Sequence, residues 1–382
     1  MRIAYVCADP GIPVTGTKGA SIHIQQIVRA FVRRGDDVTV YCSRLGDGSA
    51  TGLDDVRFVH RPVPSSDAVG REAAVADISR ELARLAVEDG CELVYERYSL
   101  FADAAAHVDV PSIVEVNAPL IEEQQRYRTL VDLVGAEGST RSVLSGADVV
   151  TCVSEPVARW ASMRGAPAER TIVVPNGVDT RRYRTDRRRT SSRLQAVFVG
   201  SLKPWHGVET VIDALRLVDG VDLTIVGDGP ERVALTARAE GLEDRVRWTG
   251  AVPHDDVAAI LDGMDVGLAP YPERAGDYFS PLKVYEYLAA GIPTIASTVG
   301  QLSSIVQHER TGLLVTPDDA GATAEALARL RDDRTGARHL GVAARERAVE
   351  RHDWDRVLED ILAPLSARSA TGRPASALGS AR

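Results

Sequence analysis

The chain has 382 residues, a net charge of −9 and a pI near 5.5, so nucleic acid and anionic membranes are not favoured as its main partners. Its length suffices for two ordinary domains, and no apolar run approaches the roughly 18–20 residues of a membrane span. The start, MRIAYVCADPG, predicts a buried strand rather than a signal peptide. The four cysteines lack metal-ligand spacing and are expected to be reduced core thiols of a cytoplasmic protein.

The first half of the chain alternates strand-like and helix-like segments. A loop rich in Gly, Pro and Thr follows the first strand, Ser21 is expected to cap the first helix, and Gly35 to end it. The order strand, helix, strand, helix, then three strands is expected at residues 2–8, 22–34, 37–43, 73–90, 93–97, 112–117 and 148–154. This alternation is typical of a parallel sheet covered by helices.

The same pattern restarts in the second half. Strands are expected at 195–201, 221–229, 245–250, 266–271, 294–298 and 312–315, with helices at 207–218, 230–242, 256–264 and 281–290. The sequence therefore predicts two doubly wound domains joined near residues 180–193. The last residues, 367–382, are small and polar and are expected to be disordered.

The predicted connection carries the densest basic run of the chain, with arginines at 181, 182, 184, 187, 188 and 189. A solvated connection is the simpler interpretation. Contact with an acidic partner or a phosphate is the alternative.

Lysine is the exception in this chain, because arginine supplies nearly all of its cations. The three lysines are Lys18, Lys203 and Lys283. Each falls in a predicted strand-to-helix loop, where ligands bind in doubly wound sheets. A compact ammonium at such positions indicates an anionic ligand, with phosphate as the natural candidate.

Lys283 stands in the stretch DYFSPLKVYEYLAAGIP, which predicts a helix with Ser280 as N-cap and Pro281 at its first position. A cation in the first turn opposes the helix dipole by about 0.3–1 kcal/mol. A bound diphosphate would remove that conflict, with Lys203 as the second cation. The alternative is a side chain that reaches into solvent.

Glu286 lies three residues beyond Lys283 on a neighbouring helix face. It could accept hydrogen bonds from a ribose diol, as the acidic residue of dinucleotide folds does, or pair with Lys283. The glycines of VGDGP, Gly227 and Gly229, would let backbone approach a ligand or simply form a turn.

Several stretches together resemble the retaining GT-B glycosyltransferases of family 4. In the second half these are VVPNGVD, VGDGPER, RVRWTGAVPHDDV and SPLKVYEYLAAGIPTIAS, in this order and spacing. In the first half, GTKGASIHIQQIVRAFVRRGDDVTVY is similar to the family's N-terminal glycine loop and helix. The resemblance covers almost the whole chain.

The resemblance implies an α/β fold of the GT-B type, with two Rossmann-like doubly wound domains facing a cleft. Residues 1–185 would form the acceptor domain, with a crossover helix at 353–366, and residues 186–352 the nucleotide-sugar domain. No metal or other cofactor is implied, because basic side chains and helix N-termini would take the charge of the leaving diphosphate.

The residue pattern and the resemblance together give a candidate site. The catalytic candidates are Lys203, Lys283 and Asn117. The donor-binding candidates are Lys18, Gly19, Ser201, His206, Gly227, Gly229, Val252, Tyr278, Ser280, Pro281, Leu282 and Glu286.

Four positions depart from the family pattern, three of them in the second half of the chain. Tyr278 replaces the first glutamate of the E-x7-E motif, which contacts the donor sugar, whereas Glu286 matches the second, which holds the ribose. Ser201 and His206 occupy the positions of an Arg and Lys pair, which makes Lys203 and Lys283 the substitutes. His206 is either a cation beside phosphate or a packed loop residue.

Asn117 replaces a histidine that is common in the first domain's cleft. The stretch that begins there, residues 117–128, is either an acceptor-facing loop or helix or a solvated amphipathic helix.

These observations predict a metal-independent, retaining transfer of a sugar from a nucleoside diphosphate to a hydroxyl acceptor. An epimerase on the same fold and a non-catalytic nucleotide-sugar-binding protein are the alternatives. The base, the sugar and the oligomeric state stay open, as does contact with a membrane surface. Antibiotic, lipid, glycan and small-thiol precursor acceptors all fit.

Overall fold

The computed structural model describes residues 1–46, 52–64, 67–184, 191–273 and 280–370, with the side chains of 367–370 left out. The chain forms two compact units, Met1–Pro175 with Trp354–Arg382, and Asn176–Asp353. Within the described residues, no helix has both the length and the apolarity to cross a bilayer.

The first unit is built on a parallel sheet of seven strands within its described residues, in the order β3-β2-β1-β4-β5-β6-β7. The central strands are rich in buried apolar residues, as strands covered on both faces must be. The strands are β1 Arg2–Cys7, β2 Asp37–Cys42, β3 Arg57–His60, β4 Leu93–Arg97, β5 Ser112–Val116, β6 Val149–Cys152 and β7 Thr171–Val173.

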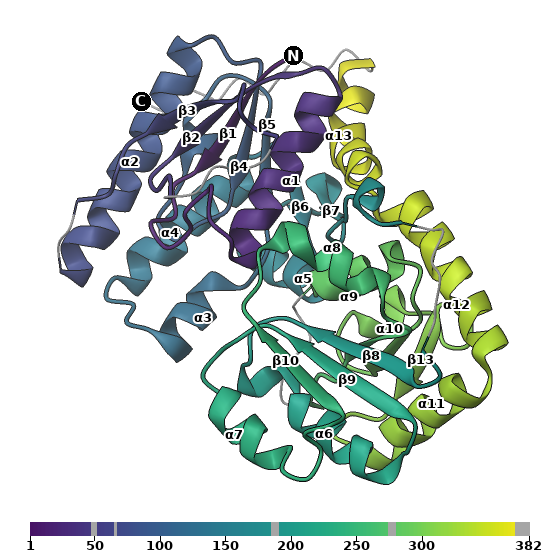
Figure 1. Cartoon of the computed structure of the whole chain (residues 1–382). Helices are drawn as coiled ribbons and strands as arrows, with labels where there is room; N and C mark the ends of the chain where they lie inside the picture. The colour runs from purple at the N-terminus through teal and green to yellow at the C-terminus, as the bar shows by residue number, and fades with distance from the viewer. Residues whose placement is uncertain (47–51, 65–66, 185–190, 274–279, 371–382) are drawn as a thin grey trace. The chain divides into compact units, whose positions relative to one another are not determined.

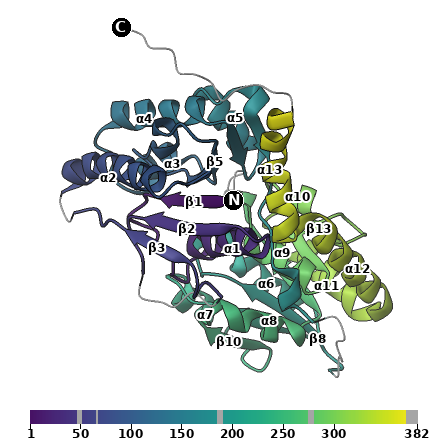
Figure 2. The same ribbon diagram turned by 90° about the horizontal axis from the view of Figure 1, so that it is seen from above.

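Helices of the first unit connect and cover these strands, and the last helix of the chain, α13, packs along α1 (Figures 1 and 2). Trp354 at the start of α13 is buried in the core of this unit and meets the ring of His23 edge-on, with 5.0 Å between ring centroids. The helices are α1 Gly19–Arg33, α2 Ala68–Glu88, α3 Leu120–Tyr127, α4 Leu133–Gly146, α5 Glu155–Met163 and α13 Trp354–Ala370, with 3₁₀ turns at Ala104–His107 and Ala168–Arg170.

The second unit repeats the arrangement with a parallel sheet of six strands in its described part, in the order β10-β9-β8-β11-β12-β13. The strands are β8 Leu194–Val199, β9 Val221–Val226, β10 Val246–Gly250, β11 Val266–Ala269, β12 Thr294–Ser297 and β13 Gly312–Val315. The helices are α6 Val208–Leu217, α7 Arg232–Arg238, α8 His254–Asp262, α9 Leu282–Ala289, α10 Leu302–Ile305, α11 Ala320–Asp332 and α12 Arg334–Arg347; 3₁₀ turns lie at Thr180–Arg182 (η3) and Pro204–His206 (η4), and a π-helical turn at Ala348–His352.

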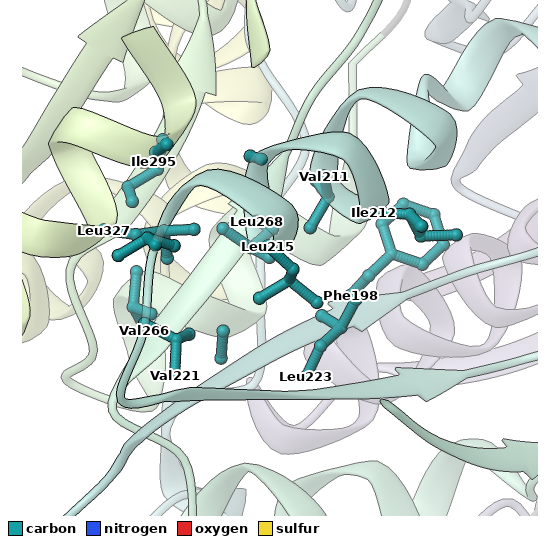
Figure 3. Close-up of a cluster of buried hydrophobic side chains, with 14 of the residues drawn as sticks. Phe198, Val211, Ile212, Leu215, Val221, Leu223, Val266, Leu268, Ile295 and Leu327 are labelled. Atoms are coloured by element: carbon teal, nitrogen blue, oxygen red, sulfur yellow. The ribbon is translucent and has the colours of Figure 1, made fainter. Parts of the chain in front are cut away.

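Apolar side chains cover both faces of the second sheet. On one face, Phe198, Leu223 and Leu268 of the strands pack with Leu215 of α6 and Leu327 of α11 (Figure 3). On the other face, α9 is buried along most of its length and lies against β11 and β12. The burial of α9 matters for function, because it carries Lys283 and Glu286.

The βα alternation predicted from sequence is confirmed in both units, and all the strand pairs of both sheets are parallel. The prediction of Ser21 as a cap is wrong. Helix α1 begins at Gly19, three residues before the expected start at 22, with Lys18 as N-cap, and the Ser21 hydroxyl is buried without a partner among the described residues.

The chain passes from the first unit to the second between Pro175 and Asn176, ten residues before the boundary at 185 expected from sequence. The physical reason is that residues just after the break bond within the second unit. The amide of Val178 donates to the His352 carbonyl at 2.7 Å, and the Thr180 hydroxyl bonds to Asp353. At the other end, α13 continues to Ala370, so the disorder expected for 367–370 is wrong, and the rest of the predicted tail lies outside the described residues.

Candidate donor site

Helix α9 starts one residue later than the sequence indicates. Pro281 is its N-cap, and no side chain caps the helix. The prediction of Ser280 as N-cap is therefore wrong, because its hydroxyl lies 3.1 Å from the Tyr285 hydroxyl and 3.4 Å from the amide of Asn176. Leu282 is then the first helical residue and Lys283 the second, and the N-cap Pro281 supplies no side-chain hydrogen bond to the first N–H groups of the helix.

Lys283 is buried, with 7% of its surface exposed, so the alternative in which it reaches into solvent is wrong. Its ammonium lies 4.0 Å from the ring centroid of Phe198 and 5.1 Å from that of Tyr271, and has no hydrogen-bond partner among the described residues. Burial lowers the pKa of Lys283 to about 7, although Glu286 acts in the opposite direction. A buried cation with unused donors is costly unless an anion meets it.

The loop after β8 leaves room for this ammonium at a glycine. Gly200 has φ +141°, and a Cβ there would lie 3.0 Å from Lys283 Nζ. The two glycines of VGDGP in turn make room for this loop. A Cβ on Gly227 would lie 2.0 Å from the Gly200 carbonyl oxygen, and one on Gly229 would lie 2.5 Å from that of Leu202. Both glycines therefore serve the packing of two loops.

Gly227→Ala is expected to destabilise the second unit by about 3 kcal/mol or more, because its Cβ would meet backbone and its φ is +135°. Thermal unfolding measures the effect. Gly263→Ala is the matched control, since a Cβ there meets its nearest atom at 3.8 Å. Equal melting temperatures for the two variants would contradict the packing role of Gly227.

His206 is packed in the loop after β8, which favours the interpretation of a packed loop residue. Its ring meets Tyr271 edge-on, with 5.4 Å between centroids, and its Nδ1 bonds to the Ser201 carbonyl. Burial, followed by the charges of Lys283 and Lys203, lowers the pKa of His206 to about 3. Lys203 is half-buried, with Nζ 5.7 Å from the centroid of the Trp205 ring.

Glu286 is also buried, one turn into α9. Its Oε1 lies 3.4 Å from Nδ1 of His254. The alternative prediction of an ion pair between Glu286 and Lys283 is wrong, because the described residues contain no such ion pair. Burial raises the pKa of Glu286 to about 7, against the opposing effects of Arg182, Tyr183 and Lys283.

Arg182 and Tyr183 are site residues that the sequence interpretation missed. The guanidinium of Arg182 donates to the His254 carbonyl at 2.9 Å and pairs with Asp255 at 3.1 Å, so this arginine is not part of a solvated connection. Nearby, the Asn176 side-chain amide donates to the Ser280 carbonyl at 3.0 Å. Nothing in the arginine run distinguishes Arg182, because its partners are distant in sequence.

The remaining donor-site candidates of the second unit lie around these residues. Val252 is half-buried and packs against the core near α8, and Ser201 is exposed. Tyr278 lies outside the described residues.

The candidates of the first unit lie in the connections that follow β1 and β5. Lys18 and Gly19 are exposed at the start of α1. Asn117 follows β5, and its side-chain nitrogen is buried without a partner among the described residues. Within the 117–128 stretch, Leu120–Tyr127 form α3, a helix that fits both the acceptor-facing and the solvated interpretation.

The first unit also holds a buried ionic cluster that the sequence interpretation missed. His23 Nε2 lies 2.7 Å from Glu115 Oε1, the Tyr95 hydroxyl donates to the same oxygen at 2.9 Å, and Arg97 lies 3.5 Å from Oε2. Burial would raise the pKa of Glu115, but His23 and Arg97 hold it at about 2. Glu115 is therefore a fixed anion two residues before Asn117.

The fold and these residues define an α/β protein with two Rossmann-like units and a buried lysine in the first turn of a helix. Two family models match the chain. The model for glycosyl transferases group 1 matches residues 193–333, and that for glycosyltransferase family 4 matches residues 17–182. The two matches cover most of the chain, which belongs to this family of glycosyltransferases and has its GT-B fold.

Among its relatives, a GDP-mannose-dependent alpha-(1-6)-phosphatidylinositol monomannoside mannosyltransferase of Mycobacterium tuberculosis is 37% identical over 239 residues, 58% of this chain. The match spans 62% of that relative. A phosphatidyl-myo-inositol mannosyltransferase of Mycobacterium leprae is 27% identical over 377 residues, which cover 95% of this chain and 96% of the relative.

Solved structures show the same fold at low identity. A sucrose-phosphate synthase from Thermosynechococcus elongatus has a TM-score of 0.74 at 21% identity, covering 97% of this chain and all of that one. HepE of Anabaena in complex with UDP has a TM-score of 0.70 at 20% identity, covering 96% of this chain and all of that one.

Proposed function

We propose that the chain is a retaining glycosyltransferase that moves a sugar from a nucleoside diphosphate to a hydroxyl acceptor without a metal ion. The observation that carries the proposal is Lys283, a buried ammonium without a partner among the described residues, placed in the first turn of α9. Family membership supports the same assignment.

In the proposed reaction, Lys283 and the N–H groups at the start of α9 stabilise the charge that develops on the leaving diphosphate. Lys203 is the second cation. Glu286, one turn further along the helix, accepts hydrogen bonds from the hydroxyls of the nucleoside ribose. The acceptor hydroxyl then attacks from the face that the diphosphate leaves, through an oxocarbenium-like state, and gives its proton to the departing diphosphate oxygen, which gives retention.

A thermal-shift screen of GDP, UDP, ADP, dTDP and their sugars tests the donor class. GDP-mannose is the first donor to try, because the name of the M. tuberculosis relative includes it. Stabilisation by a nucleoside diphosphate and its sugar, but not by the nucleoside alone, is the expected result. Incubation of the donor without acceptor separates an epimerase, which would release an isomerised nucleotide sugar.

Turnover is expected to persist in excess EDTA, because side-chain ammonium groups and helix N–H groups supply the positive charge in the proposed site. The measurement is release of nucleoside diphosphate in the presence of acceptor, with and without EDTA. Loss of turnover that magnesium restores would contradict metal independence.

A further inference from the structure

The loop that follows β8 holds an exposed tryptophan. Trp205 is 45% exposed, whereas the other tyrosine, phenylalanine and tryptophan side chains that the structure describes in the second unit are buried or half-buried. Its ring belongs to the turn η4 and lies next to that of His206, with 6.3 Å between the ring centroids. A single exposed apolar residue is ordinary, but this one stands on a fixed loop beside the candidate phosphate site.

The backbone of this loop is fixed on both sides of Trp205. Before it, the amide of the buried Leu202 donates to the Asp228 carbonyl at 2.9 Å. The turn η4 itself opens on a proline, whose ring fixes one backbone angle. After it, Gly207 has φ +63°, and a Cβ there would collide with the carbonyl of Pro270. The indole ring is therefore presented by a preorganised backbone, so little ordering entropy would be lost on binding.

Two lysines place this ring beside the candidate diphosphate site. Lys203 Nζ lies 5.7 Å from the centroid of the Trp205 ring, within the range of a cation–π contact. Burial, followed by the charges of Lys283 and Lys203, lowers the pKa of His206. Both ammonium groups therefore lie close to the residue that follows Trp205. A group attached to a diphosphate on these lysines would lie next to the indole ring.

The two ends of a bound sugar nucleotide take different places in this arrangement. Glu286, which is proposed to hold the ribose, lies one turn beyond Lys283 and beside His254 of α8. Trp205 lies instead on the loop after β8, beside Lys203. The sugar is attached to the opposite end of the diphosphate from the ribose. It is therefore the part of the donor that is left for Trp205.

We propose that Trp205 stacks on the sugar of the donor, and that this sugar is a hexopyranose with an apolar face. A pyranose ring carries C–H groups on one face, and an aromatic ring buries such groups while the hydroxyls at the edge stay available for hydrogen bonds. This stacking rests on the proposed function, because it takes the position of the diphosphate from Lys283 and Lys203. Apolar contact is non-directional, so Trp205 selects the shape of the ring and leaves the choice among hexoses to polar groups.

Calorimetric titration of the full chain with GDP, GDP-mannose, UDP and UDP-glucose tests the stacking. Trp205→Ala is expected to weaken binding of a sugar nucleotide about tenfold, near the upper range for one aromatic contact. The affinity for the matching nucleoside diphosphate should stay within about twofold. Trp205→Phe keeps an aromatic face and should retain most of the affinity for the sugar nucleotide.

The fluorescence of the chain supplies a second measurement, because the remaining tryptophans are buried or half-buried. In the unchanged protein, the sugar nucleotide should shield the emission from quenching by acrylamide, and the nucleoside diphosphate should not. Trp205→Phe should abolish this shielding. Tyr127→Ala is the control, because it removes an aromatic ring that is 60% exposed on α3 of the first unit, and it should bind all four ligands like the unchanged chain. Melting temperatures establish that each variant is folded.

Two results would overturn the stacking. One is an equal loss of affinity for the sugar nucleotide and for the nucleoside diphosphate in Trp205→Ala, which would assign the ring to the nucleotide. The other is an unchanged affinity of Trp205→Ala for all four ligands. If the unchanged chain bound none of the four ligands, the proposed function would be contradicted and the stacking with it. That outcome is distinct from the first two, in which the unchanged chain binds its donor.

Discussion

Lys283→Met is expected to raise the melting temperature of the second unit while removing affinity for nucleoside diphosphates. Burial of the charged ammonium destabilises the folded protein. The lowering of its pKa from an ordinary 10.5 to about 7 corresponds to a free-energy cost on the order of 3–5 kcal/mol before any relaxation of the surroundings. Methionine keeps the packing against Phe198 and Tyr271 without the charge. Differential scanning calorimetry and titration with nucleoside diphosphate measure the two effects.

The stabilisation by Lys283→Met is expected to decrease as the pH rises. Below pH 7 the ammonium is charged in both the folded and the unfolded chain, so the full penalty of burial is present in the native protein. Between pH 7 and 10.5 only the unfolded chain holds the proton, and the stability of the unchanged protein rises toward that of the variant. The stabilisation by Lys283→Met should therefore be largest below pH 7 and fade toward pH 10.5.

Lys18→Met is the control for Lys283→Met, because Lys18 is exposed at the start of α1 in the other unit. It should change the melting temperature little. A Lys283→Met variant that melts lower than the unchanged protein, or that binds nucleoside diphosphate and nucleoside with equal losses, would contradict the assignment of Lys283 to the phosphate.

Glu286→Gln is expected to weaken binding of a ribonucleoside diphosphate about 10- to 100-fold. Hydrogen bonds to a charged group contribute about 1.5–3 kcal/mol, and the amide lacks the charge. The 2′,3′-dideoxy analogue has no diol, so its affinity should hardly change. Calorimetry with both ligands measures the difference, and equal losses for the two would remove Glu286 from the ribose.

The unchanged protein should bind the ribonucleotide best near pH 7. Burial raises the pKa of Glu286 to about 7, so its carboxylate is lost as the pH falls below that value. Burial lowers the pKa of Lys283 to about 7, so its charge is lost as the pH rises above it. The affinity profile is then bell-shaped. Glu286→Gln should flatten the acidic side and keep the alkaline side.

The sequence predicted the elements of both sheets well, because apolar periodicity and glycine or proline punctuation are local signals. It missed β3 and β7, which are short and half-exposed. It also misassigned two caps. Both Ser21 and Ser280 stand where a cap is common, but Ser21 lies inside a longer α1 and Ser280 bonds outside its helix.

The candidate site was found in part, through the rarity of lysine and the order of the family motifs. The sequence could place Lys283 and Glu286 on the same helix, because only three residues of spacing separate them. It could not predict the contacts of Arg182, Tyr183 and His254 around Glu286, because these contacts join segments that are far apart in the chain. The ionic cluster of Glu115 was missed for the same reason.

By itself, the sequence determined the α/β alternation, the repeat of the pattern in two units, and the strand-to-helix loops that carry the three lysines. Only the tertiary structure decided that Lys283 is enclosed by Phe198 and Tyr271, that His206 packs against Tyr271, and that Gly227 packs on Gly200. The reason is physical: spacing fixes which face of a helix a residue takes, whereas burial and pKa depend on what the rest of the chain brings to that face.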